Sequence, residues 1–276
     1  MNRETALRWS GYVAMAVVFA IACAFLSNWQ FSRNAERDAE LTLVADNYAR
    51  QPVALADLIP LGQGFVPADE WRPVEIRGQY LTDQTLLVRN RPHGGTSAFE
   101  VLVPFRADDG RVVLVNRGWV PPGDDRPEPD AVPAPPAGEV TVTGRLQAGE
   151  RPVREGRSAP EGQVATIDLA LIAQMTGQTG EMLDSAYVLM AQETPAPAER
   201  PQALEDPSAD PGPYLSYAIQ WILFAVMGFA FIWYMIRTEI RHRREDDRDG
   251  GRATSRRPPR RRDRDMEAED ELLDAR

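Results

Sequence analysis

The sequence predicts an α+β membrane protein in which two transmembrane helices bracket an extracytoplasmic, mainly antiparallel β-sheet or barrel-like domain with one or two helices. Two long stretches without any charged residue lie near the two ends of the chain. Between them, apolar and polar residues alternate with the period of two that a half-buried strand requires. Proline-rich segments, which are typical of extended connectors, separate these patterns.

The first charge-free stretch covers residues 9–32. It exceeds the roughly 20 residues that a helix needs to cross about 30 Å of hydrocarbon. Arg3 and Arg8 before an apolar run are also typical of a signal peptide, but the apolar core of such a peptide is only about 7–15 residues long. The length therefore favours a retained anchor, with a cytoplasmic N-terminus over 1–9 and a transmembrane helix over 10–29.

The second charge-free stretch covers residues 211–236 and predicts a transmembrane helix over 214–236. Only Arg200 lies in the comparable stretch before it, whereas five basic residues follow it closely: Arg237, Arg241, Arg243, Arg244 and Arg248. The excess of basic residues on one side predicts a cytoplasmic C-terminus in the cell membrane. Two spans place both termini on the same side of the lipid bilayer, so residues 30–213 are predicted to be extracytoplasmic. Residues 237–276, with 13 Arg and 12 acidic residues, predict a disordered, charged cytoplasmic tail.

Charge and cysteine content exclude several classes of function. All 31 basic residues are Arg, and the net charge is −10. Residues 33–210 hold 16 Arg and 28 acidic residues, so this segment would repel the phosphates of a nucleic acid. Its negative charge favours solubility or a basic partner. The single cysteine, Cys23, excludes an internal disulfide framework and a cysteine-based metal site.

Local patterns predict the elements of the outer domain. A helix over 33–50 continues the first span, and Asp108-Asp109-Gly110 joins two strands into a hairpin. A second helix begins at Thr166 or Asp168, either of which suits an N-cap, and ends at Gly177. The predicted strands cover 73–80, 86–88, 99–105, 112–119, 140–143 and 187–190, and the proline-rich connectors are a loop over 121–136 and a stiff tether over 194–213.

Catalytic candidates are scarce. The two histidines, His93 and His242, are predicted on opposite sides of the membrane, and no nucleophile, base and orienting group occur in a recognisable pattern. His93 lies in a glycine-containing loop, where a solvated turn histidine is expected. Paired Asp residues fall in turn-like sequence, where Asp is the ordinary turn residue. The sequence therefore predicts no enzyme.

Three segments are more specific than their surroundings. The first is Trp29-Gln30…Arg33 at the outer end of the first span, and the second is a buried-looking strand that turns polar at 116–119. The third is the mouth of the second span, where Tyr217, Gln220 and Trp221 share one helical face. A glutamine at that depth either binds a facing helix or a polar ligand, or belongs to an interfacial anchor.

Taken in order, these segments resemble the surfeit locus protein 1 family. The resemblance covers roughly residues 10–236. Its two specific elements are Asn-Arg-Gly-Trp-Val-Pro at 116–121 and Tyr-Ala-x-Gln-Trp at 217–221. Weaker elements accompany them: Trp29, Gln30 and Arg33; Pro73, Val74, Gly78 and Tyr80; Pro104 and Phe105; and Gly144 to Leu146.

The resemblance implies an assembly factor for haem-copper cytochrome c oxidase of the aa3 type. Such a factor assists haem a insertion or stabilises the haem-bearing subunit, together with other assembly factors. Some bacterial members of the family are thought to bind haem a through a His at the mouth of the second helix, where this chain has Tyr214. A phenolate supports both redox states of haem less well than an imidazole, so transient haem a contact at Tyr214 is the weaker expectation and a scaffold role the stronger. The expected interaction surface comprises Trp29, Gln30, Arg33, Asn116, Arg117, Gly118, Trp119, Tyr217, Gln220 and Trp221.

Two other classes of function fit the layout of two spans around an outer domain. A permanent accessory subunit of the respiratory oxidase complex has the same sequence features as a transient factor. An extracytoplasmic sensor or binding protein needs a cytoplasmic output module, and about 40 mixed-charge residues are too few and too polar to fold into one.

Overall fold

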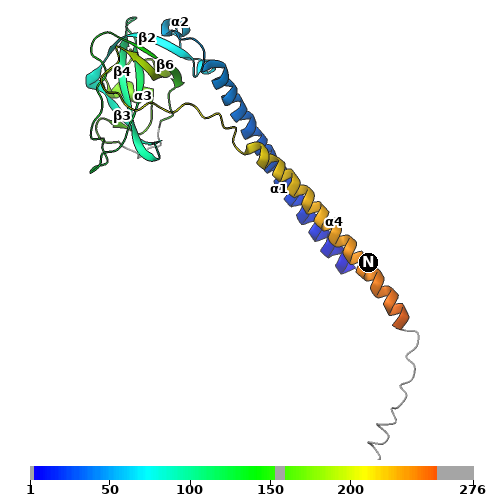
Figure 1. Ribbon diagram of the computed structural model, residues 1–276. Helices are drawn as coiled ribbons and strands as arrows, with labels where there is room; N and C mark the ends of the chain where they lie inside the picture. The colour runs from blue at the N-terminus through cyan, green and yellow to red at the C-terminus, as the bar shows by residue number, and fades with distance from the viewer. Residues whose placement is uncertain (1–2, 153–158, 254–276) are drawn as a thin grey trace, which may run out of the picture. The chain divides into compact units, whose positions relative to one another are not determined.

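The computed structural model describes residues 3–152 and 159–253. The chain forms two compact units, one of residues 1–35 with 212–276 and the other of residues 36–211. The first unit contains most of helix α1 (Arg3–Asn47) and helix α4 (Tyr214–Ala253). The second contains a β domain (Figure 1).

Helices α1 and α4 lie side by side in antiparallel orientation (Figure 1). The Ser27 hydroxyl donates a hydrogen bond of 2.9 Å to the carbonyl oxygen of Ala218, and Gly228 faces the ring of Phe19. Cys23 is buried between the helices. Small residues allow close approach of two helices, as in membrane-spanning pairs.

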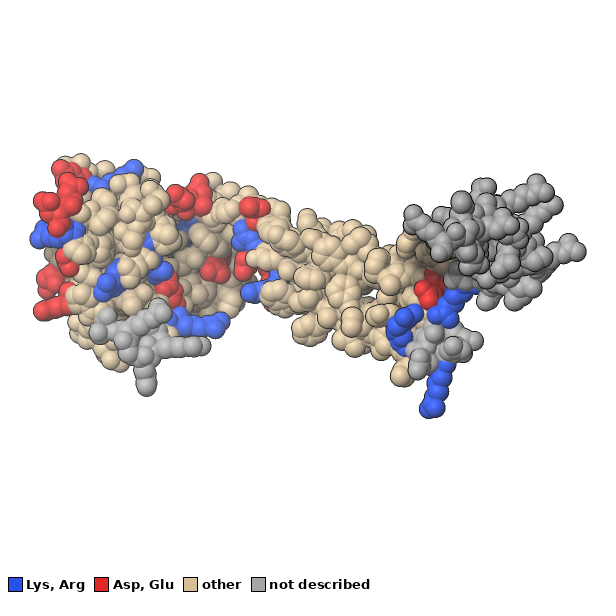
Figure 2. All heavy atoms as spheres, turned by 90° about the horizontal axis from the view of Figure 1, so that it is seen from below, with Lys and Arg blue, Asp and Glu red and all other residues tan. Residues whose placement is uncertain are grey.

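Both helices are long and apolar enough to cross a membrane, over Leu7–Asn47 and Tyr214–Glu245. The visible face of the pair shows no charged side chain along its middle (Figure 2). Helix α4 extends to Ala253, so the predicted disorder is wrong for residues 237–253. An ion pair of 2.8 Å between Glu239 and Arg243, one helical turn apart, supports the helix there. The rest of the predicted tail lies outside the described residues.

The β domain contains an eight-stranded mixed sheet in the order β1-β2-β6-β8-β5-β4-β3-β7, and an additional pairing of β2 with β4 closes five of the strands into a barrel. The parallel pair β5–β8 and the antiparallel neighbours on either side of it give the topology of a five-stranded OB-type barrel. The strands are β1 (Val53–Ala54), β2 (Pro73–Tyr80), β3 (Leu86–His93), β4 (Thr96–Ala107), β5 (Val112–Val120), β6 (Val140–Ala148), β7 (Gln163–Val164) and β8 (Ala186–Thr194).

Apolar side chains fill both faces of the central strands. One cluster, which includes Val101 and Val115, fills the barrel. The other, which includes Leu102 and Leu114, lies beneath helix α3 (Leu169–Met175). Burial on both faces explains why the centres of β4 and β5 are almost continuously apolar.

Helix α3 begins as predicted. Asp168 is its N-cap, and the side chain accepts hydrogen bonds from the N–H groups of Ala170 and Leu171. All six predicted strands are present, although most extend beyond the predicted bounds. The short strands β1 and β7 and the four-residue helix α2 (Leu55–Leu58) were missed, because so few residues give no periodic signal.

Candidate functional site

A β-bulge lies at the centre of the polar segment in β5. Glu100 of β4 pairs with Trp119, and Leu102 of β4 pairs with Asn116. Two residues of β5, Arg117 and Gly118, therefore stand opposite one residue of β4, Val101. A bulge increases the local twist and redirects side chains. The φ angle of +121° at Gly118 belongs to this irregularity and favours glycine.

Arg117 lies inside the barrel and is fully buried, which corrects its prediction as a surface residue. Its Nη2 donates to Oε1 of Glu193 at 2.6 Å, and its Nη1 donates to the carbonyl oxygen of Pro133 at 2.8 Å. The Tyr80 hydroxyl donates to the same carboxylate at 2.9 Å. Burial and the Glu193 charge raise the pKa of Tyr80, so this phenol stays protonated. Arg117 thus neutralises a buried carboxylate and holds the proline-rich loop.

Asn116 is also buried, and its side chain belongs to a second polar network. Its Nδ2 donates to Glu100 at 2.8 Å, and its Oδ1 accepts from the N–H of Gly118 at 3.1 Å. The other oxygen of Glu100 lies 3.0 Å from Nε2 of His93. Asn116 therefore links the bulge to the β3–β4 hairpin, and neither Asn116 nor Gly118 offers an exposed surface.

His93 is not the solvated turn residue that the sequence predicted. A two-residue turn, Gly94-Gly95, follows it with positive φ at both positions, as tight hairpins require. This turn places the His93 ring over Trp119, with 5.4 Å between ring centroids and an interplanar angle of 14°. The stacking and the bond to Glu100 fix the imidazole in place.

Glu150 lies next to this network. Its carboxylate accepts hydrogen bonds from the hydroxyl of Thr166 and the N–H of Ile167 and pairs with Arg91 at 2.5 Å. Burial on its own raises the pKa of Glu150, but these hydrogen bonds and the Arg91 charge outweigh it and hold the pKa below its usual value.

Trp119 is the partly exposed member of the polar segment, and it binds the tether that precedes α4. Its N–H and carbonyl oxygen both pair with Gln202 at 2.8 Å, and its indole Nε1 donates to the carbonyl oxygen of Ala203 at 3.2 Å. A Cβ on Gly118 would lie 2.2 Å from the carbonyl oxygen of Gln202. The glycine is therefore required for the tether to approach β5.

Further along, the tether is bound by Arg37 of α1 and by Tyr48, the residue that follows α1. The Tyr48 hydroxyl donates a hydrogen bond to Asp206. Burial is the main cause that raises the pKa of this phenol, and the hydrogen bond raises it further. Arg37 donates to the carbonyl oxygens of Ser208 at 2.8 Å and Asp210 at 2.9 Å. The tether is consequently held at several points between Gln202 and Asp210.

The remaining predicted residues lie on α1 and at the start of α4. On α1, Trp29 and Arg33 are exposed and Gln30 is partly exposed. On α4, Tyr214 and Trp221 are partly exposed and Tyr217 and Gln220 are exposed; Trp221 packs edge-on against Phe224. Ala218, on the seam with α1, is fully buried, so Tyr217 and Gln220 face away from α1.

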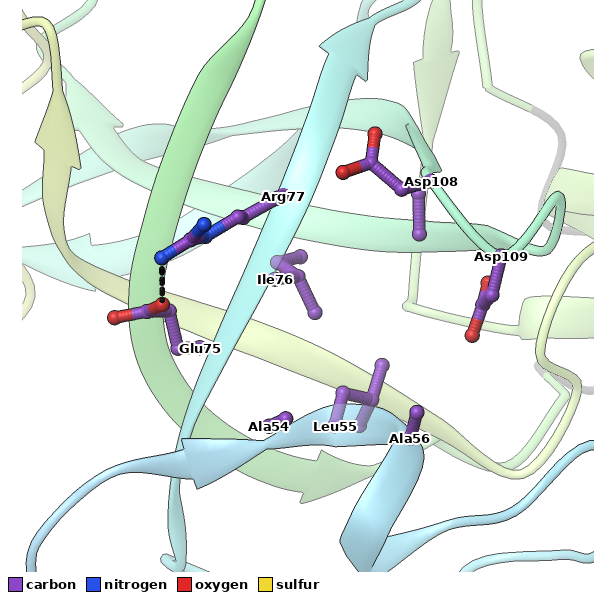
Figure 3. Close-up of a pocket in the computed structure, with 9 residues that line it drawn as sticks. Ala54, Leu55, Ala56, Glu75, Ile76, Arg77, Asp108 and Asp109 are labelled. Carbon is purple, nitrogen blue, oxygen red and sulfur yellow. Dashed lines mark hydrogen bonds and ion pairs between the residues drawn. The ribbon is translucent and has the colours of Figure 1, made fainter.

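A surface pocket of about 320 Å³ opens on the β domain between α2, β2 and the β4–β5 turn (Figure 3). Leu55 and Ile76 form its apolar floor, and Arg77 reaches toward Glu75, with 3.4 Å between the charged groups. Asp108 and Asp109 line the other side. Within the described residues, no group of three or more His, Cys, Asp or Glu side chains is arranged to hold a metal ion.

Two helices that are long and apolar enough to cross a membrane thus flank a closed β-barrel, and a polar bulge in the barrel binds the tether that leads to the second helix. A sequence model of the SURF1 family matches residues 17–226. The chain belongs to the SURF1 family.

Matches to three relatives cover between 43% and 89% of the chain. A SURF1-like protein of Mycobacterium tuberculosis is 36% identical over 257 residues, which cover 89% of this chain and 91% of that protein. The mouse protein named Surfeit locus protein 1 is 29% identical over 208 residues, 67% of this chain and 62% of its own length. The Cytochrome oxidase assembly protein SHY1 of Saccharomyces cerevisiae is 26% identical over 126 residues, 43% of this chain and 30% of its own length.

Proposed function

We propose that the protein is a membrane-anchored assembly factor for haem-copper cytochrome c oxidase of the aa3 type. Membership of the SURF1 family and the name of the yeast relative support a role in oxidase assembly. In this proposal α1 and α4 span the cell membrane, both termini are cytoplasmic, and the β domain is extracytoplasmic. The Arg residues after the second span support that orientation.

The observation that carries the proposal is the exposed amide of Gln220. It lies six residues after the start of α4, on a face that α1 does not cover. Among the described residues this side chain has no hydrogen-bond partner. An amide in hydrocarbon is stabilised when a neighbouring helix supplies one. Tyr217 lies one turn away and adds aromatic contact area.

This face therefore suits a transmembrane helix of the haem-bearing subunit. A partner helix that supplies a hydrogen bond at Gln220 would be held while its own cofactors are being inserted. The same contact would shield the immature subunit from aggregation and proteolysis.

His93 and Cys23 are poorly placed to bind haem iron. Haem iron takes His, Cys, Met or Tyr as its axial ligand. His93 is stacked on Trp119 and bonded to Glu100, while Cys23 is buried between the helices. Tyr214 remains as the ligand at the position that the resemblance indicates. The proposed role is thus stabilisation of the subunit, with any contact to haem a at Tyr214 transient.

Complementation of a deletion strain tests the proposal. Deletion should lower the haem a absorption of membranes and the amount of assembled oxidase without changing the oxidase transcript. Wild-type protein should restore both, Gln220→Leu should restore them only partly, and Leu223→Ile, a change at a neighbouring exposed position, should restore them fully.

Normal oxidase content in the deletion strain would overturn the assembly role, and full rescue by Gln220→Leu would overturn the proposed contact. Stoichiometric co-purification of the protein with mature oxidase would instead identify a permanent accessory subunit. A transient factor should co-purify with immature subunit and be lost from the mature enzyme.

A further inference from the structure

The other end of α4 carries a half-basic, half-apolar groove. It begins where the uncharged stretch ends and has a volume of about 390 Å³. Three Arg side chains line it at spacings of four and three residues, which places them on one helical face. The basic residues are Arg237, Arg241 and Arg244, and the apolar ones are Trp233, Ile236 and Ile240.

The two nearest described carboxylates, Glu239 and Glu245, do not pair with the three guanidinium groups. Glu239 projects from a different side of α4, where it pairs with Arg243 at 2.8 Å and with Arg8 of α1 at 3.4 Å. Arg237 lies over the Trp233 ring, with 5.2 Å to the ring centroid, a cation–π contact that leaves its charge in place. Glu245, next to Arg244 in the sequence, lies 3.8 Å from His242 instead. Among the described side chains, the lining Arg residues therefore form no ion pair and keep their positive charge.

We infer that this groove binds one anionic phospholipid, with the phosphate on the Arg side and an acyl chain against the apolar side. The inference rests on the membrane insertion proposed above. Arg binds phosphate through paired N–H groups, and a boundary between apolar and basic residues at the end of a span coincides with the headgroup level. Free phosphate would satisfy the guanidinium groups but would leave Ile236 and Ile240 uncovered. An amphiphile satisfies both halves of the groove.

Such a lipid would fix the depth and rotation of α4. The face that carries Gln220 would then be presented to its partner in one orientation. Basic side chains along a membrane surface act mainly through charge, whereas the groove also offers apolar side chains to an acyl chain.

Native mass spectrometry of the full-length protein in detergent tests the inference by titration with phosphatidylglycerol and, separately, phosphatidylcholine of the same acyl chains. We expect one phosphatidylglycerol to bind at least about fivefold more tightly than phosphatidylcholine, since each contributing Arg changes the affinity by roughly that factor. Arg241→Gln should reduce this preference severalfold. Arg243→Gln, two residues away but engaged with Glu239, is the matched control and should leave the preference unchanged.

Equal affinity for the two lipids, or equal losses from Arg241→Gln and Arg243→Gln, would overturn the groove as a site. Displacement of the lipid by excess inorganic phosphate would also overturn it, because the site would then take a free anion. Flotation of the protein with liposomes after alkaline washing is measured in parallel. Protein that fails to float refutes membrane insertion itself, whereas protein that floats without lipid preference refutes only the lipid site.

Discussion

Arg117→Met tests whether the polar segment of β5 is structural. Arg117 is fully buried and its ion pair with Glu193 measures 2.6 Å, so the substitution leaves a carboxylate uncompensated inside the barrel. Breaking one partner of such a pair costs about 3–5 kcal/mol. The carbonyl oxygen of Pro133 also loses its donor. For a domain of this size the midpoint of thermal unfolding should fall by roughly 10 °C.

The assay is thermal unfolding of the full-length protein in detergent, followed by tryptophan fluorescence. Arg106→Met is the matched control, because Arg106 pairs with Glu181 at a similar 2.8 Å but both side chains are largely exposed. That change should cost less than about 1 kcal/mol. Replacing both Arg117 and Glu193 by apolar residues should recover most of the loss, since no lone charge remains. A cost for Arg117→Met no larger than that of the control would refute the reasoning.

Three further predictions concern the tether, the pH dependence and the haem contact. Gly118→Ala should release the tether and increase proteolysis near Gln202, because the added Cβ would clash with the backbone there. Gly62 also has a positive φ but lies in open space, so the Gly62→Ala variant should be cleaved at the wild-type rate. The pKa of Glu150 is lower in the folded protein than in the unfolded chain, so the ionised carboxylate stabilises the fold above about pH 4.5. This contribution is lost as the pH falls through the lowered pKa. Glu150→Gln should therefore flatten the acid limb of a stability–pH curve, and an unchanged limb would contradict the assignment. Tyr214→His should increase haem a absorption in protein purified from cells that make haem a, relative to wild type and Tyr214→Phe, and identical spectra would remove position 214 from the haem contact.

The sequence predicted the regular parts of the fold because they depend on local patterns. Alternation in residues 73–80 identified β2, and the Asp168 cap identified the start of α3. The sequence left open whether the sheet closes into a barrel. Closure depends on pairing of Gly78 with Ala107, and the parallel contact of β5 with β8 joins segments about 70 residues apart. A local sequence pattern does not indicate which distant segment a strand pairs with.

In the candidate site, too, the features that depend on distant residues could not be predicted from the sequence. Asn116 and Arg117 were predicted at an interaction surface because they belong to one of the two specific elements of the family resemblance. Their burial follows from Glu100 and Glu193, carboxylates on two other strands that require compensation inside the domain. His93 was misplaced for a related reason: a Gly-Gly pair signals a turn, but only the register of the hairpin places the ring over Trp119.

Docking of the tether gives the polar segment of β5 a mechanical role. Trp119 binds the tether at Gln202, and Arg37 of α1 binds it again at Asp210. The chain that leaves the first apolar helix and the chain that returns to the second therefore run next to each other at the edge of the β domain. Within the second unit, these two attachments hold the tether against β5 and against the part of α1 that belongs to that unit. Loss of the Trp119 side chain should therefore free the tether from β5 and increase proteolysis near Gln202, in the same direction as Gly118→Ala.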